Sequence, residues 1–155
     1  MAKMIDNKPS WKGEGKVWKS LSANLPGDNV VYNQREVNGR EYDFCVMAEN
    51  LGLVIIEVKG WDPDKIDVRG VDNIIVDGYD APQTSPKKQA RAYRFAILNK
   101  IVEKYNASPL VLDMVCYPFI SQEQYVRTKL DIVSEPEYTI FKEDIEDGKK
   151  LNEKI

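Results

Sequence analysis

The sequence predicts an α/β domain in which a mixed central sheet is flanked by helices. Residues 53–56 are four consecutive apolar residues, a pattern typical of a strand buried on both faces. A second apolar run, residues 110–117, follows a long helical pattern, and neighbouring strands joined through a helix are typically parallel. The expected order is therefore helix, three antiparallel strands, helix and parallel strand.

The composition is that of one ordinary globular domain. The 155 residues are 43% apolar and 30% charged, enough for a sizeable core. No stretch approaches the roughly 18 apolar residues of a membrane span, and the N-terminus lacks a secretory signal, so we expect a cytoplasmic protein. Cys45 and Cys116 lie in predicted strands and there is no histidine. This excludes the usual zinc sites and histidine-dependent nucleophiles. The net charge of −3 does not by itself indicate a nucleic-acid-binding protein.

The first helix is expected from Ser10, a favourable N-cap, to Leu25, which precedes Pro-Gly. One stripe of this helix is apolar and consists of Trp11, Trp18, Leu21 and Leu25. Glu14 falls inside the stripe. Two interpretations remain open: Glu14 lies in a frayed first turn and faces water, or the helix directs it towards carboxylates on the strands that follow.

Two strands, residues 29–36 and 40–48, are expected on either side of Asn38-Gly39, a dipeptide suited to a two-residue type I′ turn. The third strand is residues 52–60. If the turn before it is centred near Asn50, Asp43 faces Glu57, since both lie seven positions from that residue. A shift of one residue would move Asp43 to the other face of the sheet.

The third strand ends with an acid and a base on one face. Glu57 and Lys59 are two residues apart, and side chains alternate across a strand. Facing carboxylates have Cβ atoms about 5 Å apart and repel, and a divalent cation between them is the usual reason to tolerate this. Asp43 and Glu57 are therefore predicted to be a pair of oxygen ligands. The alternative is a structural charge cluster of Asp43, Glu57 and Lys59 without a metal.

A short hairpin and an acidic loop are expected within residues 61–84. Ser85-Pro86 then begins a helix over residues 86–105, because serine is a good N-cap and proline suits the first turn. Lys87, Arg91 and Arg94 make a basic stripe on this helix, a pattern that usually indicates a solvated face. Further on, Ser121 has capping-box spacing, and the chain from Glu143 to Ile155 has the pattern of a charged helix.

The Asp-x13-Glu-x-Lys pattern of Asp43, Glu57 and Lys59 resembles the PD-(D/E)xK phosphodiesterase superfamily. Residues 38–44 and 55–61 resemble, more narrowly, the nuclease-related domain (NERD), and Gln89 and Tyr93 match its Gln-x-x-x-Tyr motif. The resemblance covers about residues 10–120. It implies a restriction-endonuclease-like core in a NERD-like domain of residues 1–120, followed by an extension, residues 121–155, that leads into a further domain.

The resemblance implies a nuclease that hydrolyses DNA with Mg²⁺ or Mn²⁺. Asp43, Glu57 and the Val58 carbonyl would bind the metal, and Lys59 would orient or deprotonate the attacking water. The helical Glu14 would belong to the same site, and Gln89 would position the water or a phosphate. The residues expected to contact DNA are Lys87, Arg91, Tyr93 and Arg94.

NERD-like domains are often fused to helicase or kinase domains. The resemblance therefore implies a larger DNA-processing protein, with a helicase domain in the same polypeptide as an expected partner. A catalytically silent DNA-docking or partner-binding module with a nuclease-like fold remains the alternative. The pattern indicates neither endo- nor exonuclease action, nor an oligomeric state.

Overall fold

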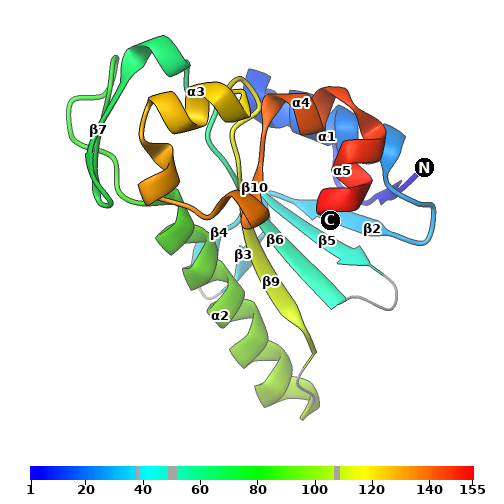
Figure 1. Ribbon diagram of the computed structural model, residues 1–155. Helices are drawn as coiled ribbons and strands as arrows, with labels where there is room; N and C mark the ends of the chain where they lie inside the picture. Colours follow the sequence, from blue (N-terminus) through cyan, green and yellow to red (C-terminus); the bar gives the residue numbers. More distant parts are fainter. Residues whose placement is uncertain (38, 49–51, 107–108) are drawn as a thin grey trace.

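The computed structural model describes residues 1–37, 39–48, 52–106 and 109–155, and its central sheet carries helices on both faces (Figure 1). The sheet order is β1-β2-β5-β6-β9-β10. Its strands are β1 Lys3–Met4, β2 Val30–Asn33, β5 Phe44–Ala48, β6 Gly52–Val58, β9 Val111–Cys116 and β10 Thr139–Ile140. Strands β2, β5 and β6 are antiparallel, and β9 runs parallel to β6. The predicted helix–three strands–helix–strand order is confirmed.

The first hairpin keeps the expected pairing but is interrupted halfway. β2 pairs with β5, and nearer the turn β3 (Glu36–Val37) pairs with β4 (Arg40–Glu41) as a separate two-stranded sheet. Gln34 has a φ of 54°, a left-handed conformation that breaks a strand. Each predicted strand is therefore split in two. Asn38 of the expected turn lies outside the described residues.

The β5–β6 register is the one that the shared turn predicts. Phe44 pairs with Ile56 and Ala48 pairs with Gly52. One pair further along, Asp43 stands opposite Glu57. Residues 49–51 of the expected turn lie outside the described part of the chain, but the ladder on either side of them places the two acids on facing strands.

Helix α1 (Lys12–Asn24) covers one face of the sheet, and of the predicted stripe Leu21 and Leu25 are buried in the core, with Trp18 packed against it. Its N-cap is Trp11 and not Ser10, and no side chain caps it. Val17 and Leu21 are fully buried, whereas the Trp11 side chain is 71% exposed. The predicted stripe is wrong at its first residue because the helix turns its Val17–Leu21 row to the sheet, which leaves Trp11 beyond it.

Helix α2 (Pro86–Tyr105) covers the opposite face, and its predicted start is confirmed. Ser85 Oγ accepts a hydrogen bond from Lys88 N at 3.2 Å. Ala90 and Ile97 are buried, and Ile97 packs in a cluster with Ile55 of β6. Between β6 and α2 lie the 3₁₀ turn Pro63–Lys65 and the predicted hairpin, formed by β7 (Ile66–Gly70) and β8 (Asn73–Val76).

The C-terminal residues belong to the same core. The capping box of Ser121 begins α3 (Gln122–Arg127), followed by the 3₁₀ turns Leu130–Ile132 and Pro136–Tyr138. The single helix expected from Glu143 is two helices, α4 (Lys142–Glu146) and α5 (Gly148–Lys154). Asp147 is extended and caps α5 through its side chain, with Lys149 N donating at 3.0 Å. This break lets both helices pack on α1.

Two further expectations concern the whole chain. Both cysteines are free and buried. Among the described residues, no helix is both long and apolar enough to cross a membrane.

Candidate functional site

Two carboxyl groups meet where β5 begins and β6 ends. Asp43 Oδ2 accepts a hydrogen bond from the backbone amide of Val58 at 2.7 Å, which ties the acid to the neighbouring strand. The Glu57 side chain is buried, and its carboxyl group lies close enough to that of Asp43 for the charge of Asp43 to act on it. The structure thus brings together the two predicted oxygen ligands.

Lys59 lies beside this pair. Its Nζ is 3.4 Å from Glu57 Oε1, and its side chain is only 19% exposed. Its backbone amide donates to the carbonyl of Cys116 at 2.9 Å, so the end of β9 holds the residue in line with β6. Glu57 and Lys59 therefore project from the same face, as the strand geometry predicts.

Burial dominates the electrostatics of the carboxyl pair. It raises the pKa of Asp43, and it raises the pKa of Glu57 to about 8, with the negative charge of Asp43 adding to the effect and Lys59 opposing it. Glu57 Oε2 is buried, and no N–H or hydroxyl group of the described residues donates to it. A buried oxygen of this kind is unfavourable unless it gains a partner. Either a proton or a cation can supply that partner.

The donor set suits a hard divalent cation. The site contains two carboxyl groups, with the Val58 carbonyl as the expected further ligand, and all-oxygen ligation favours Mg²⁺ or Mn²⁺ over zinc. Within the described residues, no cluster of three or more Asp, Glu, Cys or His side chains is close enough to enclose an ion. A pair of carboxylates nevertheless fits Mg²⁺, which commonly binds one or two of them and keeps its remaining ligands for water and phosphate.

Glu14 of α1 turns towards this pair. Its Oε2 accepts a hydrogen bond from Gln34 Nε2 at 2.8 Å. Burial raises the pKa of Glu14, the charge of Asp43 raises it further, and Lys59 lowers it. Glu14 is half-buried and lines one cleft together with Lys59, so its charge lies within electrostatic reach of the site. Its direct partner is Gln34, which was expected to lie inside a continuous strand.

A pair of glycines brings α1 to the end of β6. A Cβ on Gly13 would lie 3.1 Å from the Cα of Gly60, closer than a side chain normally packs. The absence of both side chains lets the first turn of α1 rest on the backbone just after Lys59. Glu14, the next residue of the helix, is placed beside the strand for that reason.

A cleft of about 480 Å³ opens at this junction. The first turn of α1 forms one wall, and the end of β6 forms the other. Its lining residues include Trp11, Glu14, Lys59, Trp61, Tyr79 and Phe119. The cleft gives a ligand access to Lys59 and Glu14.

The two motif residues of α2 take different positions. Tyr93 is close enough to the carboxyl pair that the charges of Glu57 and Asp43 raise its pKa, in addition to the larger effect of its own burial. Gln89 Nε2 instead donates to Thr84 Oγ1 at 3.1 Å, in the loop before the helix. The expected role of Gln89 on a water or phosphate stays a prediction.

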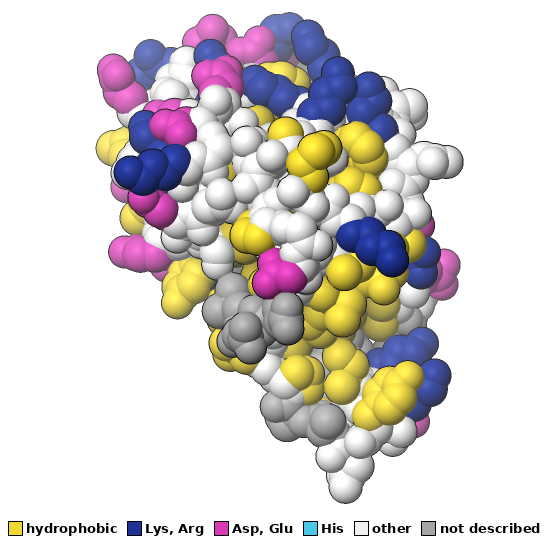
Figure 2. All heavy atoms as spheres, turned by 90° about the vertical axis from the view of Figure 1, so that its right-hand side faces the viewer, with side chains coloured by type: hydrophobic (Ala, Val, Ile, Leu, Met, Phe, Trp, Pro, Cys, Tyr) yellow, Lys and Arg dark blue, Asp and Glu magenta, His cyan; other side chains and the backbone are white. Residues whose placement is uncertain are grey.

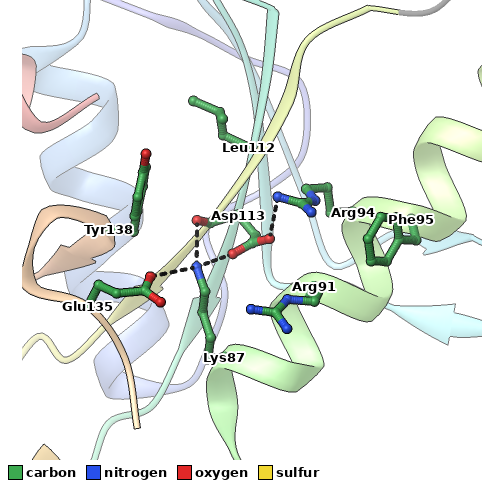
Figure 3. A pocket seen from close by; sticks show the side chains of 8 residues that line it. All are labelled: Lys87, Arg91, Arg94, Phe95, Leu112, Asp113, Glu135 and Tyr138. Atoms are coloured by element: carbon green, nitrogen blue, oxygen red, sulfur yellow. Dashed lines mark hydrogen bonds and ion pairs between the residues drawn. The ribbon is translucent and has the colours of Figure 1, made fainter. Parts of the chain in front are cut away.

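The basic stripe of α2, whose Lys87, Arg91 and Arg94 were predicted to contact DNA, is largely engaged within the protein. Lys87 is buried, and its ammonium group binds the carboxylate of Asp113 and lies 3.6 Å from Glu135 Oε2 (Figure 3). Arg94 Nη1 lies 3.1 Å from Asp113 Oδ2. Asp113 was not predicted, because it stands in an otherwise apolar strand. Of the three basic residues only Arg91 is exposed, at the edge of a pocket of about 460 Å³.

The sheet topology and the Asp43, Glu57 and Lys59 arrangement define a restriction-endonuclease-like fold of the PD-(D/E)xK type. The family model described as nuclease-related domain, NERD, matches residues 9–118. The chain belongs to this family and is a nuclease-related protein.

A repair endonuclease from Pyrococcus abyssi is a distant structural neighbour. The similarity covers 87% of this chain and 48% of the neighbour, with 14% identity and a TM-score of 0.44. The chain thus spans about half the length of that protein. No curated protein matches the sequence.

Proposed function

We propose that this domain hydrolyses phosphodiester bonds of DNA in a reaction that depends on Mg²⁺ or Mn²⁺. The observation that carries the proposal is the Glu57 carboxyl group: buried, raised in pKa, paired with Asp43, and left with an oxygen to which no described group donates. A purely structural acid would be expected to have that oxygen satisfied by a donor. Here it is left for an exchangeable proton or cation.

Asp43 and Glu57 would hold the metal together with the Val58 carbonyl. The bound metal would polarise the phosphate and lower the pKa of a coordinated water. Binding would also require Glu57 to give up the proton that its raised pKa favours, so the carboxyl pair would hold a cation in place of that proton.

Lys59 would stabilise negative charge on the phosphate in the chemical step. Its ammonium group lies beside Glu57, and Lys59 lines the cleft. It can therefore interact with negative charge that develops on a phosphate bound there. Glu14, oriented by Gln34, would accept a hydrogen bond from water in the same cleft. Of the three basic residues predicted to contact DNA, Arg91 is the exposed one, and a phosphate would be contacted through it.

Cleavage assays on linear, circular and branched DNA, with Mn²⁺ or with EDTA, test the proposal. We expect Mn²⁺-dependent products, and the choice of substrate would separate endo- from exonuclease action. A domain that binds DNA but yields no Mn²⁺-dependent product would be a docking module and not an enzyme. The helicase domain expected in the same polypeptide stays a prediction.

A further inference from the structure

A lysine-rich surface continues along α1 from the cleft that Glu14 and Lys59 line. A second cleft, of about 460 Å³, shares Trp11, Lys12 and Phe119 with the first. Its basic lining residues are Lys8, Lys12, Lys16 and Lys19. We call these four lysines, with Trp11 and Phe119, the Trp11 surface. It is separate from the basic residues of α2, which lie against the opposite face of the sheet.

The charge of this surface contrasts with that of the whole chain. The protein has a net charge of −3, yet no acid among the described residues lines the second cleft. Figure 2 shows lysine and arginine side chains, interspersed with acidic ones, along the upper edge of the molecule, the end at which α1, α3 and α4 lie in Figure 1. Local concentration of one sign of charge attracts a polyanion even when the net charge is unfavourable.

Two of the four lysines are held in place by their neighbours. Lys12 and Lys16 Nζ lie 5.8 and 5.2 Å from the centre of the Phe119 ring, within the range of a cation–π interaction. Lys16 Nζ is also 3.3 Å from the Pro118 carbonyl and from Glu146 Oε1. Lys12, Lys16 and Lys19 are spaced by four and three residues, so they share one side of the helix.

Trp11 stands at the junction of the two clefts with 71% of its surface exposed. It packs into none of the three core clusters of the described residues, although tryptophan is normally among the more buried side chains. An exposed indole beside a basic groove is a stacking platform for nucleobases. Bases within a duplex are already stacked on their neighbours, so a platform of this kind favours unpaired ones.

We propose that the Trp11 surface binds a single-stranded segment of nucleic acid, with a base stacked on Trp11 and the phosphates on the α1 lysines, and so leads it to the carboxylate pair. The inference rests on the proposed function for where the strand goes. It extends that function by naming the substrate class: single strands, or duplexes with an unpaired end or flap.

Binding in EDTA tests the inference apart from catalysis. The affinities of fluorescently labelled oligo-dT and of a duplex of equal length would be measured for the wild type and for Trp11→Ala. Tyr105→Ala is the matched control, because Tyr105 is 66% exposed at the far end of α2. We expect Trp11→Ala to weaken oligo-dT binding about fivefold or more, the low end of the effect of removing one stacked aromatic ring, and to change duplex binding less. Tyr105→Ala should change neither.

Charge reversal provides a second measurement. Lys12→Glu with Lys19→Glu should lower the salt dependence of oligo-dT binding by about 0.7 in the log–log slope for each phosphate that the variant no longer neutralises. Lys100→Glu, on α2, serves as the control. An unchanged slope would overturn the inference, and so would equal losses on oligo-dT and duplex from Trp11→Ala. Competition by polyglutamate as effective as that by oligo-dT would also overturn it, in favour of an acidic protein partner.

The two proposals can fail separately. The protein could bind oligo-dT through Trp11 and yet show no Mn²⁺-dependent cleavage. That result would contradict the nuclease proposal and support the binding surface. Conversely, the protein could cleave DNA with metal while Trp11→Ala leaves oligo-dT binding unchanged. That result would support the nuclease proposal and contradict the binding surface.

Discussion

The Asp43 carboxylate accepts a hydrogen bond from the amide of Val58 at 2.7 Å. This bond uses one oxygen of Asp43 to lock the end of one strand to the next. It leaves the other oxygen for the ion that we propose, so the same residue would combine a structural role with metal binding.

Asp43→Asn separates these two roles. The asparagine carbonyl can still accept the bond from Val58, but the negative charge is lost. We expect a folded protein whose melting temperature no longer rises with millimolar Mg²⁺ or Mn²⁺, whereas that of the wild type does. Asp67→Asn, at an exposed acid of β7, should keep the wild-type response. A metal-induced rise that survives Asp43→Asn would contradict the assignment of this ligand.

The raised pKa of Glu57 predicts how stability depends on pH. This pKa is about 8 in the folded protein, against an ordinary value of 4.5, so between these values the folded state holds a proton that the unfolded state has released. Stability therefore falls as the pH rises. Without metal, the melting temperature should decrease from pH 5 to pH 8, and Glu57→Gln should flatten this slope. Mg²⁺ should restore stability most at the alkaline end, and a slope of the opposite sign would contradict the assignment.

Lys59→Ala should affect the chemical step more than binding. Its ammonium group lies 3.4 Å from Glu57 Oε1, where, on the proposed function, it would meet negative charge that develops on the phosphate. We expect a loss of about a hundredfold or more in cleavage rate, the scale of one transition-state interaction, with DNA affinity in EDTA nearly unchanged. Lys100→Ala, at an exposed lysine of α2, is the control. Equal losses in rate and affinity would instead assign Lys59 to phosphate binding.

Asp113 should be important for stability. It is 2% exposed and binds both Lys87 and Arg94, so Asp113→Ala would leave a buried lysine without its main counter-charge. Breaking a buried pair in this way typically lowers the free energy of unfolding by about 3–5 kcal/mol. Asp67→Ala, which removes an ion pair exposed to solvent on both sides, should have little effect. Urea denaturation of both variants measures the difference.

Gly52 is required by both its conformation and its surroundings. Its φ is +120°, and an added Cβ would lie 2.2 Å from the carbonyl oxygen of Leu110. Gly78→Ala is the matched control, because Gly78 has a φ of +95° with nothing within 4 Å. We expect Gly78→Ala to lower the free energy of unfolding by about 1 kcal/mol, from backbone strain alone. Gly52→Ala should lower it clearly more. If urea denaturation gives equal losses of unfolding free energy for the two variants, the backbone at Leu110 shifts to make room for the added Cβ at little cost.

The sequence by itself determined the order of the elements, the pairing of β5 with β6 and the start of α2. These features depend on neighbours in the chain. A strand has a period of two, so the turn length and the apolar pattern select one register, and that register is sufficient to set Asp43 opposite Glu57. Ser85 and Pro86 mark a helix start because capping acts within one turn.

Only the tertiary structure decided what each helix face meets. Trp11 is exposed and Val17 buried because the Gly13–Gly60 contact sets where α1 lies on the sheet, and residues 47 positions apart carry that contact. Lys87 is buried because Asp113 lies under α2 on a strand that reads as apolar, and Glu14 is held by Gln34 through a local break in β-structure. Each outcome depends on side chains that converge only after folding, which no local pattern encodes.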